Sequence, residues 1–430
     1  MKTKELYDQY MITGMVAGFE PIEVDSASAA TMTGLDGKTY IDCYAGISVT
    51  NAGHNHPKII AAAKAQMEKL VHCCTYVYYS PRAGELAKVL ADITPGKLQK
   101  TFFGNGGAEA IEGALRLARQ FTGKTEFIAN MQSFHGRSNM TLSITGNRAR
   151  KKNGGPFASG IAFTPAPYSY RCPFGSKTDE ECAARTAEYL RDTIRYATSG
   201  DVAAYIAEPL MGEGGIISPH ESYYKLVKKI LEEEGILFIA DEVQSGFGRT
   251  GKMFAIEHFG VEPEIMTMAK GIADGFPLSA FTVRADIADA FKPGDHLSTF
   301  GGNPISCAAA IANIDVLQNE GLVKNSEVRG NQIMTRLKKF MEKSSIVGEV
   351  RGRGLMIGIE LVKDKKSKTP AVDAAKNVRK ACRENGVLIG VGGSFANVLR
   401  IQPPLCITET QAAEVCDKLE KAITEAEKAV

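Results

Sequence analysis

Two residues near the middle of this chain could together perform covalent chemistry. Asp241 ends an apolar run at residues 237–240, and Lys270 follows a second apolar run. Continuous apolar runs are typical of strands in a parallel sheet that is covered on both faces. The carboxyl ends of such strands border a crevice where ligands bind. We therefore predict that both side chains lie at one edge of a sheet, where the lysine amine can form an imine with an aldehyde.

An aspartate beside a pyridine nitrogen would complete this chemistry. Opposite charge in a site of low dielectric favours the protonated nitrogen, and the ring then withdraws electrons. Pyridoxal 5′-phosphate is an aldehyde cofactor that needs both groups, a cradle for its phosphate and a flat group against its ring. The sequence therefore favours an enzyme that holds this cofactor through Lys270, with Asp241 at the ring nitrogen.

Two further segments could supply the phosphate cradle and the flat group. Glycines lead from an apolar run into a predicted helix at residues 110–120, so Gly107 and Ala108 are placed to bind phosphate through backbone N–H groups. An ordinary tight turn would have the same sequence. Phe134 follows the apolar run 127–130 and could stack on a heterocycle, although a role in the core fits it equally well.

Charged residues near other apolar runs could contribute to a substrate site. Arg137 could grip a carboxylate with two nitrogens, or it could lie on the surface. Glu208 and Glu213 stand at and beyond the end of another predicted strand, and Glu213 either pairs with an arginine or is a solvated loop acid. Arg400 lies inside the apolar run 398–401, where a buried guanidinium needs a salt bridge or a substrate carboxylate.

The composition is that of a globular enzyme. The 430 residues exceed the usual length of one domain, so we expect two or more. Lys and Arg total 51 against 49 acidic residues, and we therefore expect neither nucleic acid nor a membrane as a partner. The nine cysteines show no metal-ligand spacing or disulfide frame, and no signal peptide is evident, so we predict a cytoplasmic protein without a structural metal.

The order of the predicted elements favours an α/β fold. Short apolar runs alternate with helical patterns, which indicates a mostly parallel sheet with helices on both faces. The runs lie at residues 127–129, 203–206, 237–239 and 265–266. Residues 147–160 contain several basic side chains and glycines, so we predict an exposed loop there rather than a basic binding patch.

The pattern changes near residue 313 to amphipathic helices and short strands. We therefore predict a large cofactor-binding α/β domain at residues 61–313 and a smaller C-terminal α+β domain at residues 314–430. The N-terminal segment, residues 1–60, is expected to join the small domain.

Residues 246–252 match parts of two nucleotide-binding motifs. Gly246, Gly248 and Gly251 fit the dinucleotide pattern, and Lys252 adds most of a triphosphate loop. Met253 stands where that loop needs Ser or Thr, and no strand enters the first glycine directly. A nucleotide-dependent enzyme that uses Gly246–Gly251 therefore remains a disfavoured alternative, as does a noncatalytic protein that only binds the cofactor.

The motifs together resemble one family. Residues 241–251 (DEVQSGFGRTG) and 268–271 (MAKG) are similar to the signature of class III pyridoxal-phosphate-dependent aminotransferases, and the similarity extends from about residue 36 to the last strand. The resemblance implies the aspartate-aminotransferase-like fold, called fold type I, and a homodimer with shared active sites that could pair into a tetramer. It implies that Lys270 forms the imine, Gln244 approaches the ring hydroxyl and Thr299 reaches the phosphate bound to the neighbouring subunit.

Within the class, residues 45–54, 134–137 and 212–215 look most like 4-aminobutyrate and other ω-amino-acid transaminases. This resemblance implies substrate-binding residues, namely Ile47, Arg137, Glu208, Glu213 and Arg400. Arg137 would hold the distal carboxylate of the amino donor. Glu213 would mask Arg400 until a 2-oxoacid, expected to be 2-oxoglutarate, arrives in a ping-pong reaction.

Other members of the class remain as alternatives. Asn105, Met211 and the insert at residues 170–175 depart from the usual 4-aminobutyrate pattern. Alanine–glyoxylate and β-alanine–pyruvate aminotransferases therefore stay open. The 2,2-dialkylglycine decarboxylases fit less well, because their characteristic glutamine near the Ile47 segment and their tryptophan against the ring are both missing here, and this chain contains no Trp.

Overall fold

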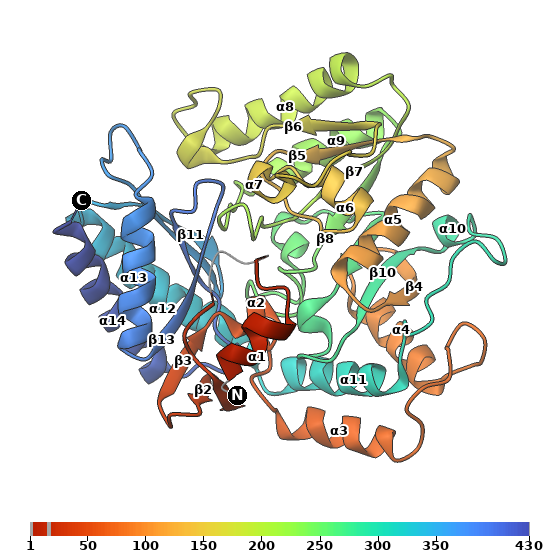
Figure 1. Ribbon diagram of the computed structural model, residues 1–430. Helices are drawn as coiled ribbons and strands as arrows, with labels where there is room; N and C mark the ends of the chain where they lie inside the picture. Colours follow the sequence, from red (N-terminus) through yellow and green to blue (C-terminus); the bar gives the residue numbers. More distant parts are fainter. Residues whose placement is uncertain (1–2, 15–18, 430) are drawn as a thin grey trace.

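The protein is built on two seven-stranded sheets, one in each of two lobes (Figure 1). The computed structural model describes residues 3–14 and 19–429. The first sheet forms the core of the larger lobe and carries the strands predicted around Asp241 and Lys270. The second sheet joins the two ends of the chain.

The first sheet has the strand order β4-β10-β9-β8-β7-β5-β6. Strands β9, β8, β7, β5 and β6 are parallel, whereas β10 runs antiparallel to both β4 and β9. All four predicted apolar runs are strands of this sheet. The bounds are β4 (Leu98–Gly104), β5 (Glu126–Asn130), β6 (Ile161–Thr164), β7 (Val202–Ala207), β8 (Leu237–Asp241), β9 (Ile265–Met268) and β10 (Ser279–Arg284).

The central strands are buried on both faces. Phe238 contributes to one hydrophobic cluster and its neighbour Ile239 to the other, and Tyr205 and Ile206 divide in the same way. Because successive side chains of a strand point to opposite faces, burial on both sides requires an unbroken apolar run. This is why the sequence of β8 is apolar throughout until it ends at Asp241.

Helices cover both faces of this sheet. Helix α5 (Gly107–Thr122) belongs to one hydrophobic cluster, whereas α8 (Asp179–Ala197) and α9 (Tyr223–Glu233) belong to the other. Below them in Figure 1, α11 packs against α3 and α4. Each of these three helices begins with proline, which is suited to the first turn because its missing N–H would have no partner there. Their bounds are α3 (Pro57–Met67), α4 (Pro81–Ile93) and α11 (Pro304–Asn319).

The second sheet brings the two ends of the chain together. Its order is β1-β2-β3-β13-β14-β12-β11, and β13 pairs in parallel with β3. The strands are β1 (Val24–Ser28), β2 (Thr31–Gly34), β3 (Thr39–Cys43), β11 (Val347–Arg353), β12 (Met356–Leu361), β13 (Val387–Gly392) and β14 (Val398–Ile401). Helices α12 (Leu322–Lys343), α13 (Val372–Glu384) and α14 (Glu409–Glu427) complete this lobe. The domain boundaries near residues 60 and 313 stay a prediction.

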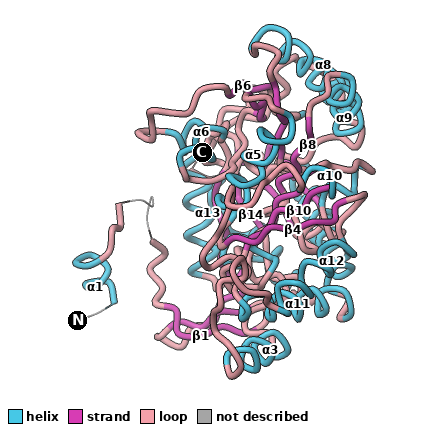
Figure 2. Tube along the Cα trace, turned by 90° about the vertical axis from the view of Figure 1, so that its right-hand side faces the viewer, coloured by secondary structure: helices cyan, strands magenta, loops and turns pink. Residues whose placement is uncertain are grey.

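Several short elements complete the fold. Figure 2 shows α1 apart from the body of the protein, and none of its residues is buried. The short helices are α1 (Thr3–Tyr10), α2 (Ala45–Ser48), α6 (Asn139–Ile144), α7 (Arg148–Lys151) and α10 (Ala285–Ala288), with 3-10 helices η1 (Ser169–Arg171), η2 (Ala255–Phe259) and η3 (Lys270–Ile272). Helix α7 lies inside the segment that we predicted to be a loop.

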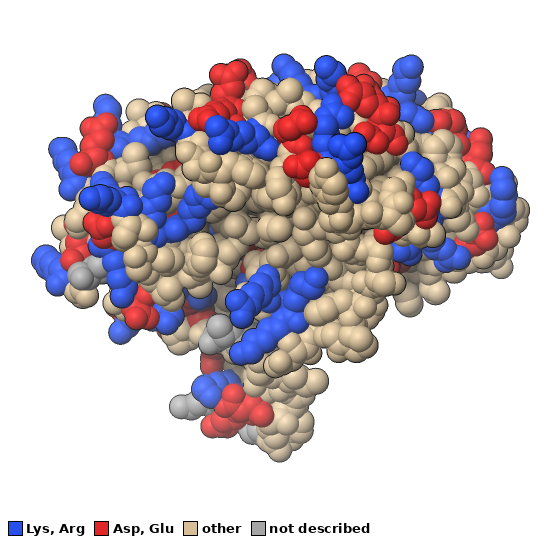
Figure 3. Space-filling model, turned by 90° about the horizontal axis from the view of Figure 1, so that it is seen from above, with Lys and Arg blue, Asp and Glu red and all other residues tan. Residues whose placement is uncertain are grey.

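On the face seen in Figure 3, basic and acidic side chains are interspersed. Among the residues that the structure describes, no helix combines the length and the apolar character needed to cross a membrane. The same part of the chain contains no cluster of three His, Cys, Asp or Glu side chains that could hold a metal ion.

Candidate active site

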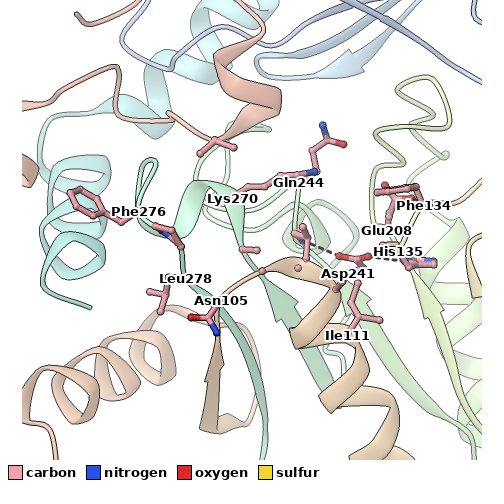
Figure 4. A pocket seen from close by; sticks show the side chains of 18 of the residues that line it. Asn105, Ile111, Phe134, His135, Glu208, Asp241, Gln244, Lys270, Phe276 and Leu278 are labelled. Carbon is pink, nitrogen blue, oxygen red and sulfur yellow. Dashed lines mark hydrogen bonds and ion pairs between the residues drawn. The ribbon is translucent and has the colours of Figure 1, made fainter. Parts of the chain in front are cut away.

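Asp241 and Lys270 lie at the same edge of the first sheet. Asp241 is the last residue of β8 and pairs in register with Thr267 of the parallel strand β9, and Lys270 follows β9 at the start of η3. Both line one cavity with a volume of about 310 Å³ (Figure 4). Parallel strands end at a common edge, which explains how a separation of 29 positions in the sequence becomes one site.

Other predicted cofactor residues line the same cavity. Gly107 and Ala108 form the first turn of α5, Phe134 follows β5, and Gln244 follows β8. The helix begins three residues earlier than the predicted residue 110. Its first backbone N–H groups have no partner inside the helix, so they are available to an anion.

His135 is a site residue that the sequence analysis did not select. Its Nδ1 lies 2.7 Å from Oδ2 of Asp241, and both side chains are buried. The other carboxylate oxygen accepts the backbone N–H of Val243 at 3.0 Å. These contacts fix the orientation of Asp241 toward the cavity. The sequence feature that could have indicated His135 is its position directly after Phe134. Both residues follow β5, which lies two places from β8 in the sheet.

The environment of Lys270 favours its neutral amine. Burial is the largest cause, and the positive charge of Arg400 adds to it, so that the pKa of Lys270 is lowered to about 8 from 10.5. Asp241 is the strongest of the three acids that oppose this shift. The backbone of Lys270 has a φ of +46°, a conformation that costs a residue with a side chain about 1 kcal/mol or more.

Glu208 holds two loops of the site in place. One oxygen of its carboxylate accepts the backbone N–H of Phe134 at 2.9 Å, and the other accepts that of Gly212 at 2.8 Å. Burial raises the pKa of Glu208 to about 7, although the nearby His135 opposes the shift. Because both oxygens bind backbone groups, we interpret Glu208 as a residue that positions the ring of Phe134.

Glu213 and Arg400 form an ion pair. Arg400 lies in β14 of the second sheet, and its Nη1 donates to Oε2 of Glu213 over 2.8 Å. The Nε and Nη2 atoms of Arg400 are buried and have no hydrogen-bond partner among the described residues. A second arginine, Arg150 of α7, donates to the same carboxylate. Burial would raise the pKa of Glu213, but the two arginines outweigh it and the pKa is lowered.

Like Glu213 and Arg400, the remaining predicted residues lie outside the walls of the cavity in this chain. Ile47 is 42% exposed and has a positive φ of 70°. The guanidinium of Arg137 lies 5.6 Å from the centre of the Phe134 ring, and its side chain is exposed. Thr299 is also exposed. The roles of these three residues stay predictions.

In the segment that resembles a nucleotide-binding motif, Arg249 has a structural role. Arg249 is completely buried, and its guanidinium donates to the carbonyl of Leu355 at 3.1 Å and to the side chain of Asn51 at 2.6 Å. Residues 243–253 form turns and bends, and the next element is η2. A phosphate loop needs the start of a helix at this point, so this geometry disfavours nucleotide binding.

Comparison with known proteins identifies the family. The family described as "Aminotransferase class-III" matches residues 16–423. The chain belongs to the class III aminotransferases. The enzymes of this family use pyridoxal 5′-phosphate, which is therefore the cofactor of this protein. A solved amine transaminase from an uncultivated Pseudomonas species, in its PLP-bound form, has a TM-score of 0.91 and 31% identity over 97% of this chain and 99% of its own.

Curated relatives of this aminotransferase carry different names. A leucine/methionine racemase of Thermococcus litoralis is 40% identical over 99% of this chain and 97% of its own length. An acetylornithine aminotransferase of Methanothermobacter thermautotrophicus is 41% identical over 94% and 95%. A probable 4-aminobutyrate aminotransferase of Bacillus subtilis is 36% identical over 97% and 96%. The family and the fold type I architecture are thus established, and these relatives differ in the reaction that their names state.

The cavity of this aminotransferase fits its cofactor. A Cβ on Gly107 would lie only 2.9 Å from a methyl group of Val243, which also lines the cavity, so a side chain at the start of α5 would crowd the cavity wall. The Nε2 atoms of Gln244 and His135 are buried without a partner in the described chain. Buried polar atoms of this kind are rare in complete structures, and a ligand with polar groups would satisfy them.

Proposed function

We propose that this aminotransferase moves an amino group from an ω-amino acid similar to 4-aminobutyrate to a 2-oxoacid, with 2-oxoglutarate as the preferred acceptor. The observation that carries the proposal is the pair of Glu213 and Arg400. One pocket must accept a donor that lacks an α-carboxylate and then an acceptor that has one. A movable acid that neutralises the idle guanidinium solves this problem, because an unpaired buried charge is costly.

The residues of the cavity have separate roles in this proposal. Lys270 binds the cofactor covalently and, once its amine is released, carries a proton to and from the substrate carbon. A pKa of about 8 suits this task, since the amine can both accept and donate a proton near neutral pH. Asp241, oriented by His135, faces the ring nitrogen. Bound pyridoxal phosphate supplies an aldehyde that exchanges amines and a ring that withdraws electrons.

Three other cofactor contacts belong to this proposal. Gly107 and Ala108 bind the phosphate through the start of α5. Phe134 stacks on the ring, and the backbone contact of its N–H with Glu208 sets its position. Gln244, whose Nε2 has no partner among the residues that the structure describes, reaches the ring hydroxyl.

The donor site involves Arg137 and Ile47. Arg137 is exposed beside Phe134, so its guanidinium is free to bind the distal carboxylate of an ω-amino acid. Ile47 is fixed in a positive-φ conformation and presents an apolar side chain to the donor chain. Support comes also from the Bacillus subtilis relative named as a probable 4-aminobutyrate aminotransferase.

The racemase relative suggests a second candidate, the racemisation of an α-amino acid. Substrate and product of that reaction both carry an α-carboxylate, which would occupy Arg400 throughout. The acid that covers Arg400 would then have no function. The ion pair between Glu213 and Arg400 therefore favours transamination.

A donor and acceptor panel tests the proposed function. Purified wild-type enzyme should transfer amino groups from ω-amino acids to 2-oxoglutarate, measured as glutamate formed. Lys270→Ala should abolish turnover, and Arg137→Ala should raise the KM for ω-amino acids. Production of D-amino acids without amino transfer, followed by chiral chromatography, would support racemisation instead. Unchanged use of ω-amino acids by Arg137→Ala would remove the reason for this choice of donor.

We further propose that the enzyme is a cytoplasmic homodimer in which Thr299 reaches the phosphate bound by the partner subunit. Two segments near the cavity expose apolar side chains and contact each other, since Thr75 donates to the carbonyl of Gly301 and the rings of His72 and Phe300 lie 5.2 Å apart. The exposed residues include Val77, Tyr78, Tyr79, Leu297 and Phe300. An apolar surface of this kind is typical of a subunit interface.

Sedimentation of the wild type and of Tyr79→Asp tests this assembly. The wild type should sediment as a dimer or tetramer, and the charge should shift it toward monomers that lose the cofactor. Thr299→Ala should keep the assembly and weaken cofactor retention. A monomeric wild-type enzyme with full activity would contradict the shared site.

A further inference from the structure

Two arginines from different parts of the chain hold Glu213. Arg400 of β14 donates to Oε2 of the carboxylate over 2.8 Å. Arg150 of α7 donates from Nε to the other oxygen, Oε1, over 2.8 Å, and its Nη2 contacts the same oxygen. One carboxylate thus serves two cations, and the three side chains together carry a net positive charge.

The two arginines differ in burial and in the use of their nitrogens. The side chain of Arg400 is 1% exposed, and two of its nitrogens have no partner within the described chain. The side chain of Arg150 is 38% exposed on a short helix that has no buried residues. Buried donors without partners indicate a ligand. Of the two arginines, Arg400 is therefore the one that has donors available to bind a substrate carboxylate.

A carboxylate that binds the unpartnered Nε and Nη2 of Arg400 brings a second negative charge beside Glu213, and the repulsion between the two carboxylates favours release of Glu213 from Nη1. Glu213 would then lose one cation and face an incoming group of the same charge. Its side chain is only 16% exposed, so an unpaired carboxylate at this position would be strongly unfavourable. Arg150 already contacts the oxygen that Arg400 does not use, and it can keep the carboxylate paired.

We propose that Arg150 is a positioning residue that retains Glu213 when a substrate carboxylate occupies Arg400, and that Arg150 thereby sets the affinity of the enzyme for 2-oxoacids. The inference rests on the proposed function, because it uses Arg400 as the acceptor site. A donor without an α-carboxylate leaves Glu213 on Arg400. Arg150 therefore matters in the acceptor half of the reaction and not in the donor half.

The two half-reactions of the holoenzyme, followed separately by cofactor absorbance, test this role. In Arg150→Gln, the 2-oxoglutarate concentration for half-maximal rate should rise about tenfold, the size expected for losing one charged partner, with an unchanged maximal rate. The donor half-reaction should keep both constants. Arg150→Lys should retain most of the affinity. Arg148→Gln is the matched control, because Arg148 is exposed on the same helix and should behave as wild type.

Binding of glutarate, measured by calorimetry, gives a readout that does not depend on turnover. Glutarate has the carboxylates of the acceptor but no reactive carbonyl, and Arg150→Gln should weaken its binding by a similar factor. Equal glutarate affinity in wild type and Arg150→Gln overturns the inference, and so does equal loss in both half-reactions. If the wild-type enzyme does not accept ω-amino acids as donors, the proposed function is overturned. The glutarate titration still tests the role of Arg150 in that case.

Discussion

The titration of Lys270 in the apoenzyme is a direct consequence of the site geometry. Burial and the nearby Arg400 lower the pKa of this amine to about 8, whereas the ordinary value is 10.5. The neutral amine, which is the reactive form, should therefore appear with an inflection near pH 8.

The size of the effect follows from the two pKa values. At about pH 7, roughly one tenth of the Lys270 amines should be neutral, against about one in three thousand for an ordinary lysine. The neutral fraction is therefore about 300 times larger than that of an ordinary lysine. Access to the cavity changes the absolute rate of a reaction with the amine, but it does not change the pH of the inflection.

Competitive labelling with a small acylating reagent measures this titration. Apoenzyme is labelled across the pH range together with free Nα-acetyl-lysine as the internal standard, and the Lys270 peptide is quantified by mass spectrometry. The labelling rate of Lys270 should level off above about pH 9, while the standard continues to gain. An inflection of Lys270 near that of the standard would refute the argument that burial and Arg400 favour the neutral amine.

The same pKa predicts how the stability of the apoenzyme depends on pH. Between about pH 8 and 10.5, the unfolded chain holds a proton that the folded chain has released, so the free energy of unfolding rises with pH in this window. The full change contributed by Lys270 is about 3 kcal/mol. In Lys270→Met this contribution is absent, so the difference in unfolding free energy between the two proteins should change by that amount. A constant difference across the window would contradict the shifted pKa.

Two further predictions concern stability. In a denaturant titration, Arg249→Ala should lower the free energy of unfolding by about 3 kcal/mol or more, because it leaves buried acceptors unpaired and creates a cavity. In the same titration, Arg82→Ala removes only an exposed ion pair and should lower the free energy of unfolding by less than about 1 kcal/mol. Gly330→Ala should lower the thermal midpoint of unfolding, since the new Cβ would clash with the carbonyl oxygen of Gly354. Gly84→Ala should raise this midpoint, because Gly84 lies in helix α4 with open space around it. Equal shifts of the midpoint in both variants would contradict this reasoning.

Much of the fold could be predicted because its signals are local. The apolar runs before Asp241 and Lys270 indicated strands buried on both faces, and the structure confirms them as β8 and β9. Two strands of the same sheet were not predicted. Strand β6 has four residues and lies at the sheet edge, and β10 mixes Ser and Thr with apolar residues, so neither has a distinct pattern.

The prediction of a loop at residues 147–160 was incomplete. Helix α7 has only four residues and no apolar face, so no periodicity could indicate it. Arg150 is one of the basic side chains in this predicted exposed loop. The structure pairs it with Glu213, which lies 63 positions along the chain.

Local sequence patterns were enough to indicate a site for an aldehyde cofactor, because strand patterns, the glycines before α5 and the residues at strand ends depend on neighbours along the chain. The residue pairs that tune this site depend on packing between distant segments. His135 meets Asp241, and Arg150 and Arg400 share Glu213, because separate strands and loops converge at one sheet edge. Contacts between residues so far apart in the sequence depend on how the elements pack, so local sequence patterns do not predict them.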